Sequence, residues 1–238
     1  MPTEKEYAEI FPRPSVSEVA CEIRFAPRLR VIPEVWRIQE ELAESYPEVM
    51  EETVPQADAR LVPTFVFANS ALKKTIRISQ ENFVFITNIY SSFEEFKSEA
   101  LTRIFAFAEN FDVSSFKRVG LRYVNNIALE GNDQIGLLRR YVNVPVDLDR
   151  FDVSRVEQFL TEFRLKGAQG HRITFRGAFL RIPNASDARF ILDLDSYSQE
   201  VTPRDQLDTL LDEFHHEIQT QFLTHITNEY KEVMRRKK

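Results

Sequence analysis

The chain has 238 residues, which is enough for one large domain or two small ones. Hydrophobic residues make up 43% and charged residues 29%, a composition typical of a packed protein and not of a disordered one. The 37 acidic residues outnumber the 31 basic ones, giving a formal net charge of −6. Proteins that bind duplex DNA usually carry a basic excess, so this balance counts against non-specific nucleic-acid binding.

The cysteine content and the hydropathy pattern restrict the class of protein further. Cys21 is the only cysteine, which excludes an internal disulfide and a cysteine-rich zinc site. No apolar run approaches the roughly 18 residues that span a membrane, and the acidic, polar start does not resemble a signal peptide. We therefore expect a cytoplasmic protein with no membrane partner.

The first half of the chain predicts the element order β-α-β-β-β-β-α. Residues 16–25 alternate apolar and polar side chains, the period of a strand with one buried face. Apolar residues at helical spacing predict a helix at 33–47. A second helix is predicted at 93–110, opened by a capping box in which Ser92 is the cap and Glu95 reaches back. Between these helices, strands are predicted at 49–54, 61–68, 73–79 and 82–90.

The second half of the chain repeats much of this order. A strand is predicted at 119–124, where Leu-Arg-Tyr resembles the Ile-Arg-Phe of the first strand. A short helix is predicted at about 133–141, and a long final helix runs from 203 to as far as 234, with Thr202 as its cap. The first sheet strand of this half is not assigned. The further strands are predicted at 156–165, 172–182 and 188–195.

Two units in the same order predict an α+β fold made of tandem duplicated β-α-β4-α units. They would span 1–112 and 113–238 and form one curved antiparallel sheet with helices on one face. This element order resembles the duplicated saddle fold of the TATA-binding protein, a resemblance that concerns the fold and not the function. Two ferredoxin-like modules or a helix-grip fold are the alternative architectures.

Three short motifs carry a second resemblance. They are Ser17-Glu18-Val19 followed by Glu22-Ile23-Arg24-Phe25, Arg118-Val119-Gly120-Leu121-Arg122-Tyr123-Val124-Asn125, and Leu192-Asp193-Leu194-Asp195. With these motifs the chain resembles, over most of its length, a sporadically distributed and uncharacterised bacterial protein family. Scattered occurrence implies an accessory protein of a mobile-element or defence system. The resemblance supplies no catalytic residues.

The first candidate site is a polar cluster on the central strand, formed by Arg118, Arg122, Asn125 and Asn126. Arg122 and Asn126 share a strand face with Gly120. A bare backbone, a planar cation and an amide together can recognise a phosphate, a carboxylate or a base edge. The alternative is structural, with Arg122 paired to acids on neighbouring strands and both asparagines satisfying the end of a strand or a turn.

The second candidate site is the sheet face that the helices would leave uncovered. Arginine outnumbers lysine there, which favours planar recognition or ion-pair networks. Acids alternate with these arginines, so much of the charge is expected to cancel between strands. The predicted residues of this face are Glu22, Arg24, Arg77, Glu162, Arg164, Arg172, Arg176, Asp193 and Asp195. Across both sites, the predicted ligand- or partner-binding residues are Arg24, Arg77, Arg118, Arg122, Asn125, Asn126, Arg164 and Arg176.

No catalytic motif was found. The chain has no Gly-x-Ser-x-Gly, no P-loop and no Gly-x-Gly-x-x-Gly. Asp193 and Asp195 share a strand face without a third ligand, and Asp212 and His216 are only two ligands on one helix. We therefore expect no metal and no cofactor, and we favour a protein without enzymatic activity.

The sequence favours a non-catalytic binding or adaptor protein that uses its sheet face to hold a protein partner or a second copy of itself. Nucleic-acid binding through the arginines of a concave face is the first alternative. A sensor of a small anionic ligand, with Arg122 and Asn126 as its polar anchors, is the second.

Overall fold

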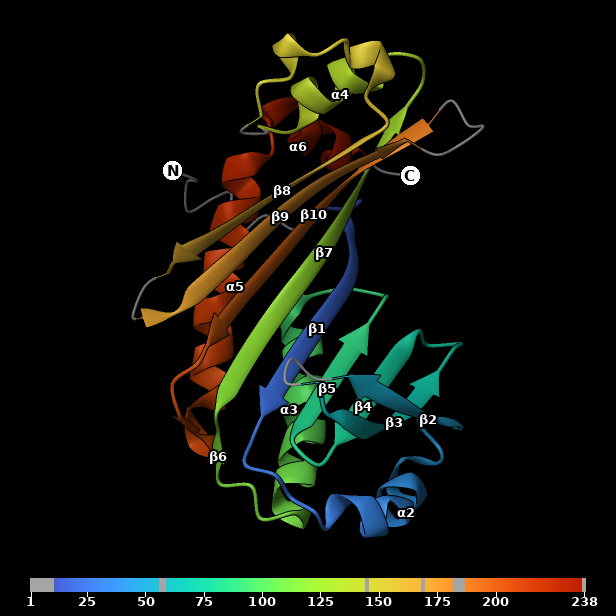
Figure 1. Ribbon diagram of the computed structural model, residues 1–238, viewed down its shortest axis with the longest axis vertical. Coiled ribbons are helices and arrows are strands. Elements are labelled where there is room, and N and C mark those ends of the chain that lie inside the picture. The colour runs from blue at the N-terminus through green and yellow to red at the C-terminus, as the bar shows by residue number, and fades with distance from the viewer. Residues whose placement is uncertain (1–10, 56–58, 144–145, 168–169, 182–186, 237–238) are drawn as a thin grey trace. The chain divides into compact units, whose positions relative to one another are not determined.

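A computed structural model describes residues 11–55, 59–143, 146–167, 170–181 and 187–236 (Figure 1). The chain is an α+β protein with a large antiparallel sheet, which confirms the predicted fold class. Its nine strands lie side by side in the order β2 (Glu48–Pro55), β3 (Leu61–Asn69), β4 (Lys74–Ser79), β5 (Asn82–Thr87), β1 (Val16–Arg24), β7 (Arg118–Glu130), β10 (Asp187–Ser198), β9 (Arg172–Arg181) and β8 (Gln158–Lys166).

The strand order agrees with a duplicated element order, because β1 and β7, the first strand of each half, are neighbours at the centre. The first half adds four strands beyond β1. Within the described residues, the second half adds three beyond β7, so the copies differ by one strand. The helices are α2 (Val31–Leu42), α3 (Phe93–Asn110), α4 (Gln134–Tyr141), α5 (Leu207–His225) and α6 (Asn228–Arg235). None of the helices in the described part of the chain is long and apolar enough to cross a membrane.

The chain divides into two compact units, which do not coincide with the sequence halves. One unit, here called the β1–β5 unit, comprises Glu18–Arg122 and Tyr197–Phe214. The other, here called the β8–β10 unit, comprises Met1–Ser17, Tyr123–Ser196 and His215–Lys238. Strand β7 contributes residues to both units, because the division of the chain falls within it, between Arg122 and Tyr123.

The core of the β1–β5 unit lies between the sheet and α3, which runs behind the strands in Figure 1. Strand alternation turns the apolar residues of β1 and β5 toward this helix, and Cys21 pairs with Phe85 across the two strands. The Phe83 and Phe107 rings lie 5.2 Å apart, and the Phe85 and Phe96 rings lie 5.5 Å apart. Such ring pairs explain why so many phenylalanines occur in the first half.

Helix α3 begins where the sequence predicts it. The Ser92 hydroxyl accepts a hydrogen bond from the Glu95 N–H at 3.2 Å, which confirms the predicted cap. The reciprocal bond of a capping box is not the one formed, because the Glu95 carboxylate instead accepts from the Ser91 hydroxyl. Ser92 therefore provides the side-chain cap of this helix without the reciprocal bond from Glu95.

The core of the β8–β10 unit lies between its strands and α5. The Phe175 ring of β9 contacts the His225 ring of α5, with centroids 4.4 Å apart, and the Ser196 hydroxyl of β10 donates to Glu217 of α5 at 2.8 Å. A Cβ at Gly177 would lie 2.8 Å from the Phe190 ring, so the glycine leaves room for that ring. These contacts fix which face of β9 and β10 the helix covers.

The single final helix predicted at 203–234 is wrong, because α5 and α6 are separate helices. Ile226 forms an isolated bridge with Val142, and the Thr227 N–H donates to the Tyr141 carbonyl at 2.9 Å in place of a helical partner. The Thr227 hydroxyl then accepts from the Tyr230 N–H at 3.2 Å and caps α6. The predicted cap at the other end is also wrong: β11 (Thr202–Pro203) stands there and pairs with β6 (Ser115–Phe116).

Candidate functional site

The predicted binding residues lie mainly on the sheet surfaces that face away from the helices. We call these surfaces the outer faces of the two units and define them by Arg24 and Arg122 in one unit and Arg176 in the other. Strand alternation and cross-strand register place seven of the eight predicted residues on an outer face. Asn125 is the exception.

The first charged cluster, on the outer face of the β1–β5 unit, is centred on the Glu22 carboxylate. Glu22 accepts from the Arg24 Nε at 2.8 Å and forms a second ion pair with Arg118 of β7. The Arg118 guanidinium lies 4.8 Å from the centre of the Tyr197 ring. A Cβ at Gly120 would lie 2.7 Å from Nη1 of Arg118, so the bare backbone lets this side chain lie along the strand.

The two arginines of this first cluster differ in their access to solvent. The side chain of Arg118 is 17% exposed, whereas that of Arg24 is 52% exposed. Arg118 is therefore largely covered within the face, whereas Arg24 presents its guanidinium to solvent. Close by, burial raises the pKa of the Cys21 thiol to about 12, so the only thiol stays protonated at neutral pH and is no nucleophile.

Arg122 also has an acidic neighbour. Its Nη1 lies 3.7 Å from Oε1 of Glu18 on β1, a long contact between two partly exposed side chains. Strand β7 places Asn126 on the same strand face as Arg122, as predicted from the alternation. The Asn126 N–H donates to the Ser15 carbonyl at 2.7 Å, so its backbone is committed to the N-terminal segment.

Asn125 does not join this cluster, because it faces the helices. It is 2% exposed and accepts from the Ser15 hydroxyl at 3.1 Å. Its side-chain amide donates to the Leu192 carbonyl of β10 at 3.3 Å. Its grouping with Arg122 overlooked the two-residue period of a strand, which separates 125 from 122 and 126. Asn125 is therefore placed to hold β7, β10 and the N-terminal segment together.

The second charged cluster lies on the outer face of the β8–β10 unit and is centred on the Glu162 carboxylate. Glu162 accepts from the Arg176 Nε at 2.7 Å and pairs with Arg164 at 3.0 Å. Arg176 also donates to Asp193, a nearly buried carboxylate, at 3.3 Å. The hydrogen bond from Arg176 lowers the pKa of Glu162, so this carboxylate stays ionised at neutral pH.

Both clusters share one construction that sequence reasoning missed. A Glu-x-Arg triplet, at 22–24 and again at 162–164, puts an acid and an arginine on one strand face, and the neighbouring strand adds a second arginine to the same acid. In the second cluster the inner Arg176 is 36% exposed and the outer Arg164 is 69% exposed. The triplets are visible in the sequence, but the second arginine depends on strand register.

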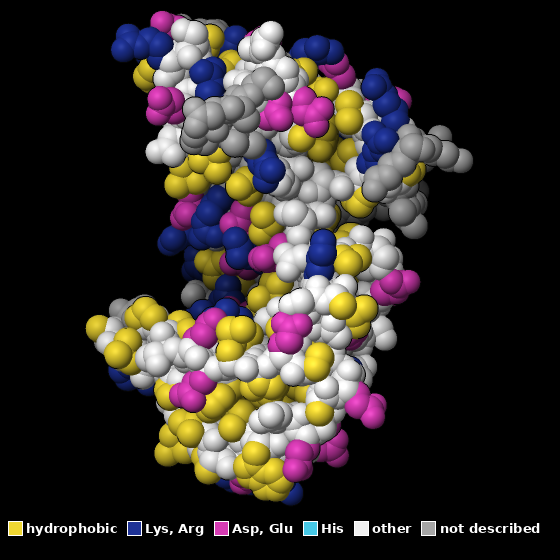
Figure 2. All heavy atoms as spheres, turned by 90° about the vertical axis from the view of Figure 1, so that its right-hand side faces the viewer, with side chains coloured by type: hydrophobic (Ala, Val, Ile, Leu, Met, Phe, Trp, Pro, Cys, Tyr) yellow, Lys and Arg dark blue, Asp and Glu magenta, His cyan; other side chains and the backbone are white. Residues whose placement is uncertain are grey.

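The remaining predicted arginine, Arg77 on β4, pairs with Glu52 on β2 at 2.5 Å. Charges of both signs are therefore interleaved, as Figure 2 also shows for the surface it displays, where Lys and Arg side chains lie beside Asp and Glu side chains.

Among the described residues, no group of three or more His, Cys, Asp or Glu side chains is placed to hold a metal ion. The described arrangement is one of paired charges.

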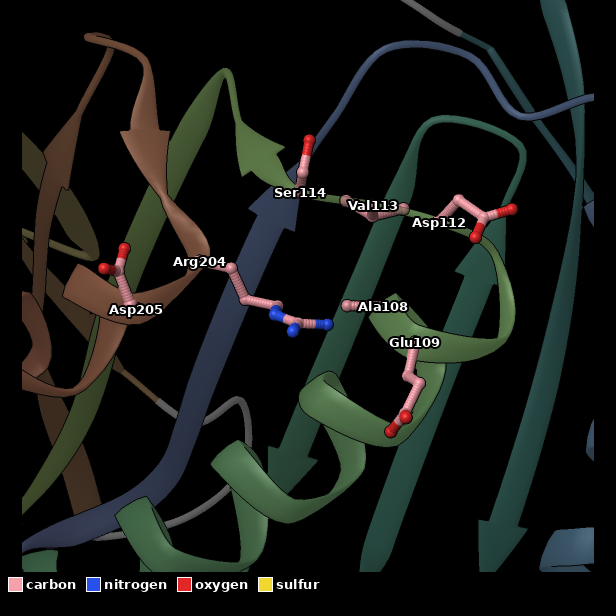
Figure 3. A pocket seen from close by; sticks show the side chains of 7 residues that line it. All are labelled: Ala108, Glu109, Asp112, Val113, Ser114, Arg204 and Asp205. Atoms are coloured by element: carbon pink, nitrogen blue, oxygen red, sulfur yellow. The ribbon is translucent and has the colours of Figure 1, made fainter.

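A cleft of about 500 Å³ at the end of α3 was not predicted from the sequence (Figure 3). Arg204 extends toward Ala108 on α3, and Asp205 points away from it. The cleft is lined by Ala108, Glu109, Asp112, Val113, Ser114, Arg204 and Asp205. Three acids and one arginine without a common focus define no chemistry, so we do not place the function in this cleft.

Comparison with known proteins adds no identification. No protein-family model matches the chain, and no curated protein matches it.

Proposed function

We propose that this protein is a non-catalytic binding protein that holds a protein partner on the ion-paired outer faces of its sheet. One observation carries the proposal: each arginine predicted to bind a ligand has an acidic partner within its own unit. The pairs are Arg24–Glu22, Arg118–Glu22, Arg122–Glu18, Arg77–Glu52, Arg164–Glu162, Arg176–Glu162 and Arg176–Asp193.

The pairing favours a protein partner over a nucleic acid. A phosphate backbone would have to approach Glu22 or Glu162 as closely as the arginines, and this repulsion opposes the gain from counterion release. A protein surface supplies side chains of both signs and can complement such a face. Exposed ion pairs contribute only about 0–1 kcal/mol each to stability, so exchanging their partners on binding costs little.

The partner class follows from the same reasoning. A face of alternating charges is specific for a surface with the opposite alternation, and charge complementarity sets specificity and association rate more than affinity. The resemblance to a sporadic bacterial family suggests where such a partner is encoded. We therefore include in the proposal an accessory role in a mobile-element or defence system, with another protein of that system as the partner.

The test uses the two outer arginines, because their loss should leave the fold intact. In Arg24→Ala and Arg164→Ala, each acid keeps its inner arginine, Arg118 or Arg176. Affinity capture from the source cells, quantified by mass spectrometry, should recover specific proteins with the wild type and lose them with the double variant. The matched control is Arg37→Ala, which removes an equally exposed, ion-paired arginine from α2.

Two outcomes would contradict the proposal. The first is that the double variant and the Arg37→Ala control capture the same proteins as the wild type. The second is that labelled DNA or RNA binds the wild type at low salt and is released steeply as salt rises, the behaviour of phosphate contacts. We expect no such nucleic-acid binding.

A further inference from the structure

Strand β8 is an edge strand, because it ends the nine-strand order and is paired on one side with β9. Five consecutive residues, Glu162–Lys166, are exposed. An edge strand carries a row of N–H and C=O groups that can pair with a strand of another chain.

The side chains of β8 are apolar as well as exposed. Phe163 lies beside Phe175 of β9, with ring centroids 6.1 Å apart, yet it is 41% exposed while Phe175 is 2% exposed. The cause is the position of α5, whose His225 covers Phe175. Leu165 on the same face, and Leu160 on the outer face, are exposed too. These apolar side chains lie on an edge that otherwise faces water.

The opposite edge of the sheet order is built differently. Strand β2 carries Glu48, Glu51 and Glu52 and ends at Pro55. Edge charges and proline are the features by which proteins prevent strand pairing between chains. Strand β8 has no proline, and its charges are of both signs, so the same protection is weaker there.

We propose that β8 pairs antiparallel with β8 of a second copy of this chain. The two-fold axis of this dimer would pass midway between the two strands, where Phe163 of one copy faces Phe163 of the other. Directly opposite residues of an antiparallel pair point to the same face of the sheet. At the two-fold axis, one residue of β8 must therefore face the same residue of the other copy. This restriction leaves only a few registers to compare.

Charge selects among these registers. With the axis at Phe163, Glu162 of each copy lies opposite Arg164 of the other, which gives two complementary pairs on the outer face. With the axis at Glu162 or at Arg164, like charges face each other across the axis, and such pairs destabilise a sheet. At Phe163 the two Phe163 rings also meet on the helix-side face, and each Leu165 lies opposite Thr161. The favoured register therefore removes apolar surface from water and pairs the charges together.

This inference rests on the edge strand and its register and does not require the proposed partner binding, although Glu162 and Arg164, which set the register, also belong to the second charged cluster. In the resulting dimer, both copies would keep their helices on the same side. The two sheets would join into one, and the outer Arg164 would gain a second acid.

Charge reversal tests the register directly. We expect the wild type to sediment at twice the mass of one chain, and Glu162→Arg or Arg164→Glu alone to weaken dimerisation about tenfold or more, because each places like charges opposite one another. An equimolar mixture of these two variants should dimerise again, since arginines of one chain then meet glutamates of the other. Glu51→Arg makes the same charge change on β2 and should leave the mass unchanged.

Cysteine cross-linking gives a second readout. Phe163→Cys should form a disulfide-linked dimer on mild oxidation, whereas Leu160→Cys should not, because its thiols would lie about six strand residues apart. The native Cys21 is buried and should not interfere. Any of three results would overturn the inference: a monomeric wild type at all concentrations, a mixture of the two charge variants that stays monomeric, or open-ended oligomers abolished by Glu51→Arg, which would indicate pairing of β8 with β2.

Discussion

The Arg118 guanidinium occupies the space that a side chain at position 120 would need, since a Cβ there would lie 2.7 Å from Nη1 of Arg118. Gly120 has an ordinary strand backbone, because the positive-φ glycines of the described chain lie elsewhere. An alanine at 120 therefore meets a flexible side chain and not a strained backbone. The geometry couples the two residues through space and not through the chain.

We predict that the effect of Gly120→Ala depends on Arg118. In the wild type, the loss of the Glu22 pair and the Tyr197 contact should offset the gain of about 0.5–1 kcal/mol from replacing a strand glycine. In an Arg118→Ala background, that gain should appear in full. A double-mutant cycle by urea denaturation measures the coupling. Equal effects of Gly120→Ala in both backgrounds would contradict it.

Substitution of Asn125 tests the role of the sheet face that packs against the helices. Asn125→Ala leaves the Ser15 hydroxyl and the Leu192 carbonyl without their observed partner, which should lower the free energy of unfolding by about 1–3 kcal/mol. Asn126→Ala changes the next residue, on the outer face, and should cost less than about 0.5 kcal/mol. Denaturation of both variants checks the assignment, and equal losses would place the two asparagines in equivalent environments.

Removal of the α6 cap should lower the stability of that helix locally. Thr227→Ala removes the acceptor for the Tyr230 N–H and a donor to the Arg140 carbonyl, and should destabilise the protein by about 1 kcal/mol. Thr227→Ser keeps the hydroxyl and serves as the control. Hydrogen exchange should show faster opening of α6 in the alanine variant, while α5 stays protected. Unchanged exchange in α6 would mean that its packing and not its cap decides its stability.

The buried thiol of Cys21 should make the free energy of unfolding decrease at alkaline pH. Burial, reinforced by the neighbouring Glu22, raises the pKa of the thiol from 9.0 to about 12. Above pH 9 the unfolded chain loses this proton while the folded chain keeps it, so stability is complete below pH 9 and falls as pH rises toward 12. The slope should reach about 1.4 kcal/mol per pH unit.

The control for this prediction is Cys21→Ala, in which the alkaline slope should decrease by that amount. The buried Tyr46 and Tyr230 side chains, whose pKa values are also raised, should keep their contributions in both proteins. Denaturant titrations at several pH values above 9 provide the measurement. Parallel pH profiles for the two proteins would show that Cys21 is not the group responsible.

The fold could be predicted to the level at which local patterns determine it. Alternation at 16–25 and the Ser92 cap each depend on a few adjacent residues, and both appear in the structure. The break between α5 and α6 could not be predicted in this way, because the apolar helical period continues through it. The bridge between Ile226 and Val142 that accompanies the break joins residues far apart in the chain.

The candidate site follows the same division. That Arg24 and Arg164 lie two residues from an acid on the same strand face is readable from the sequence. Arg118 pairs with the same acid as Arg24, although it lies 96 residues from Glu22 in the sequence. This contact could be predicted only with the register of β1 against β7. The local period alone was enough to separate Asn125 from Asn126.

The sharing of one acid by two arginines has a consequence for how this surface can change. In each cluster the inner arginine keeps the carboxylate paired, so the outer one, Arg24 or Arg164, can be replaced without stranding a buried charge. Substitutions at these two positions can therefore change the charge of the outer face at little cost in folding. The inner arginines would keep both carboxylates paired in such variants.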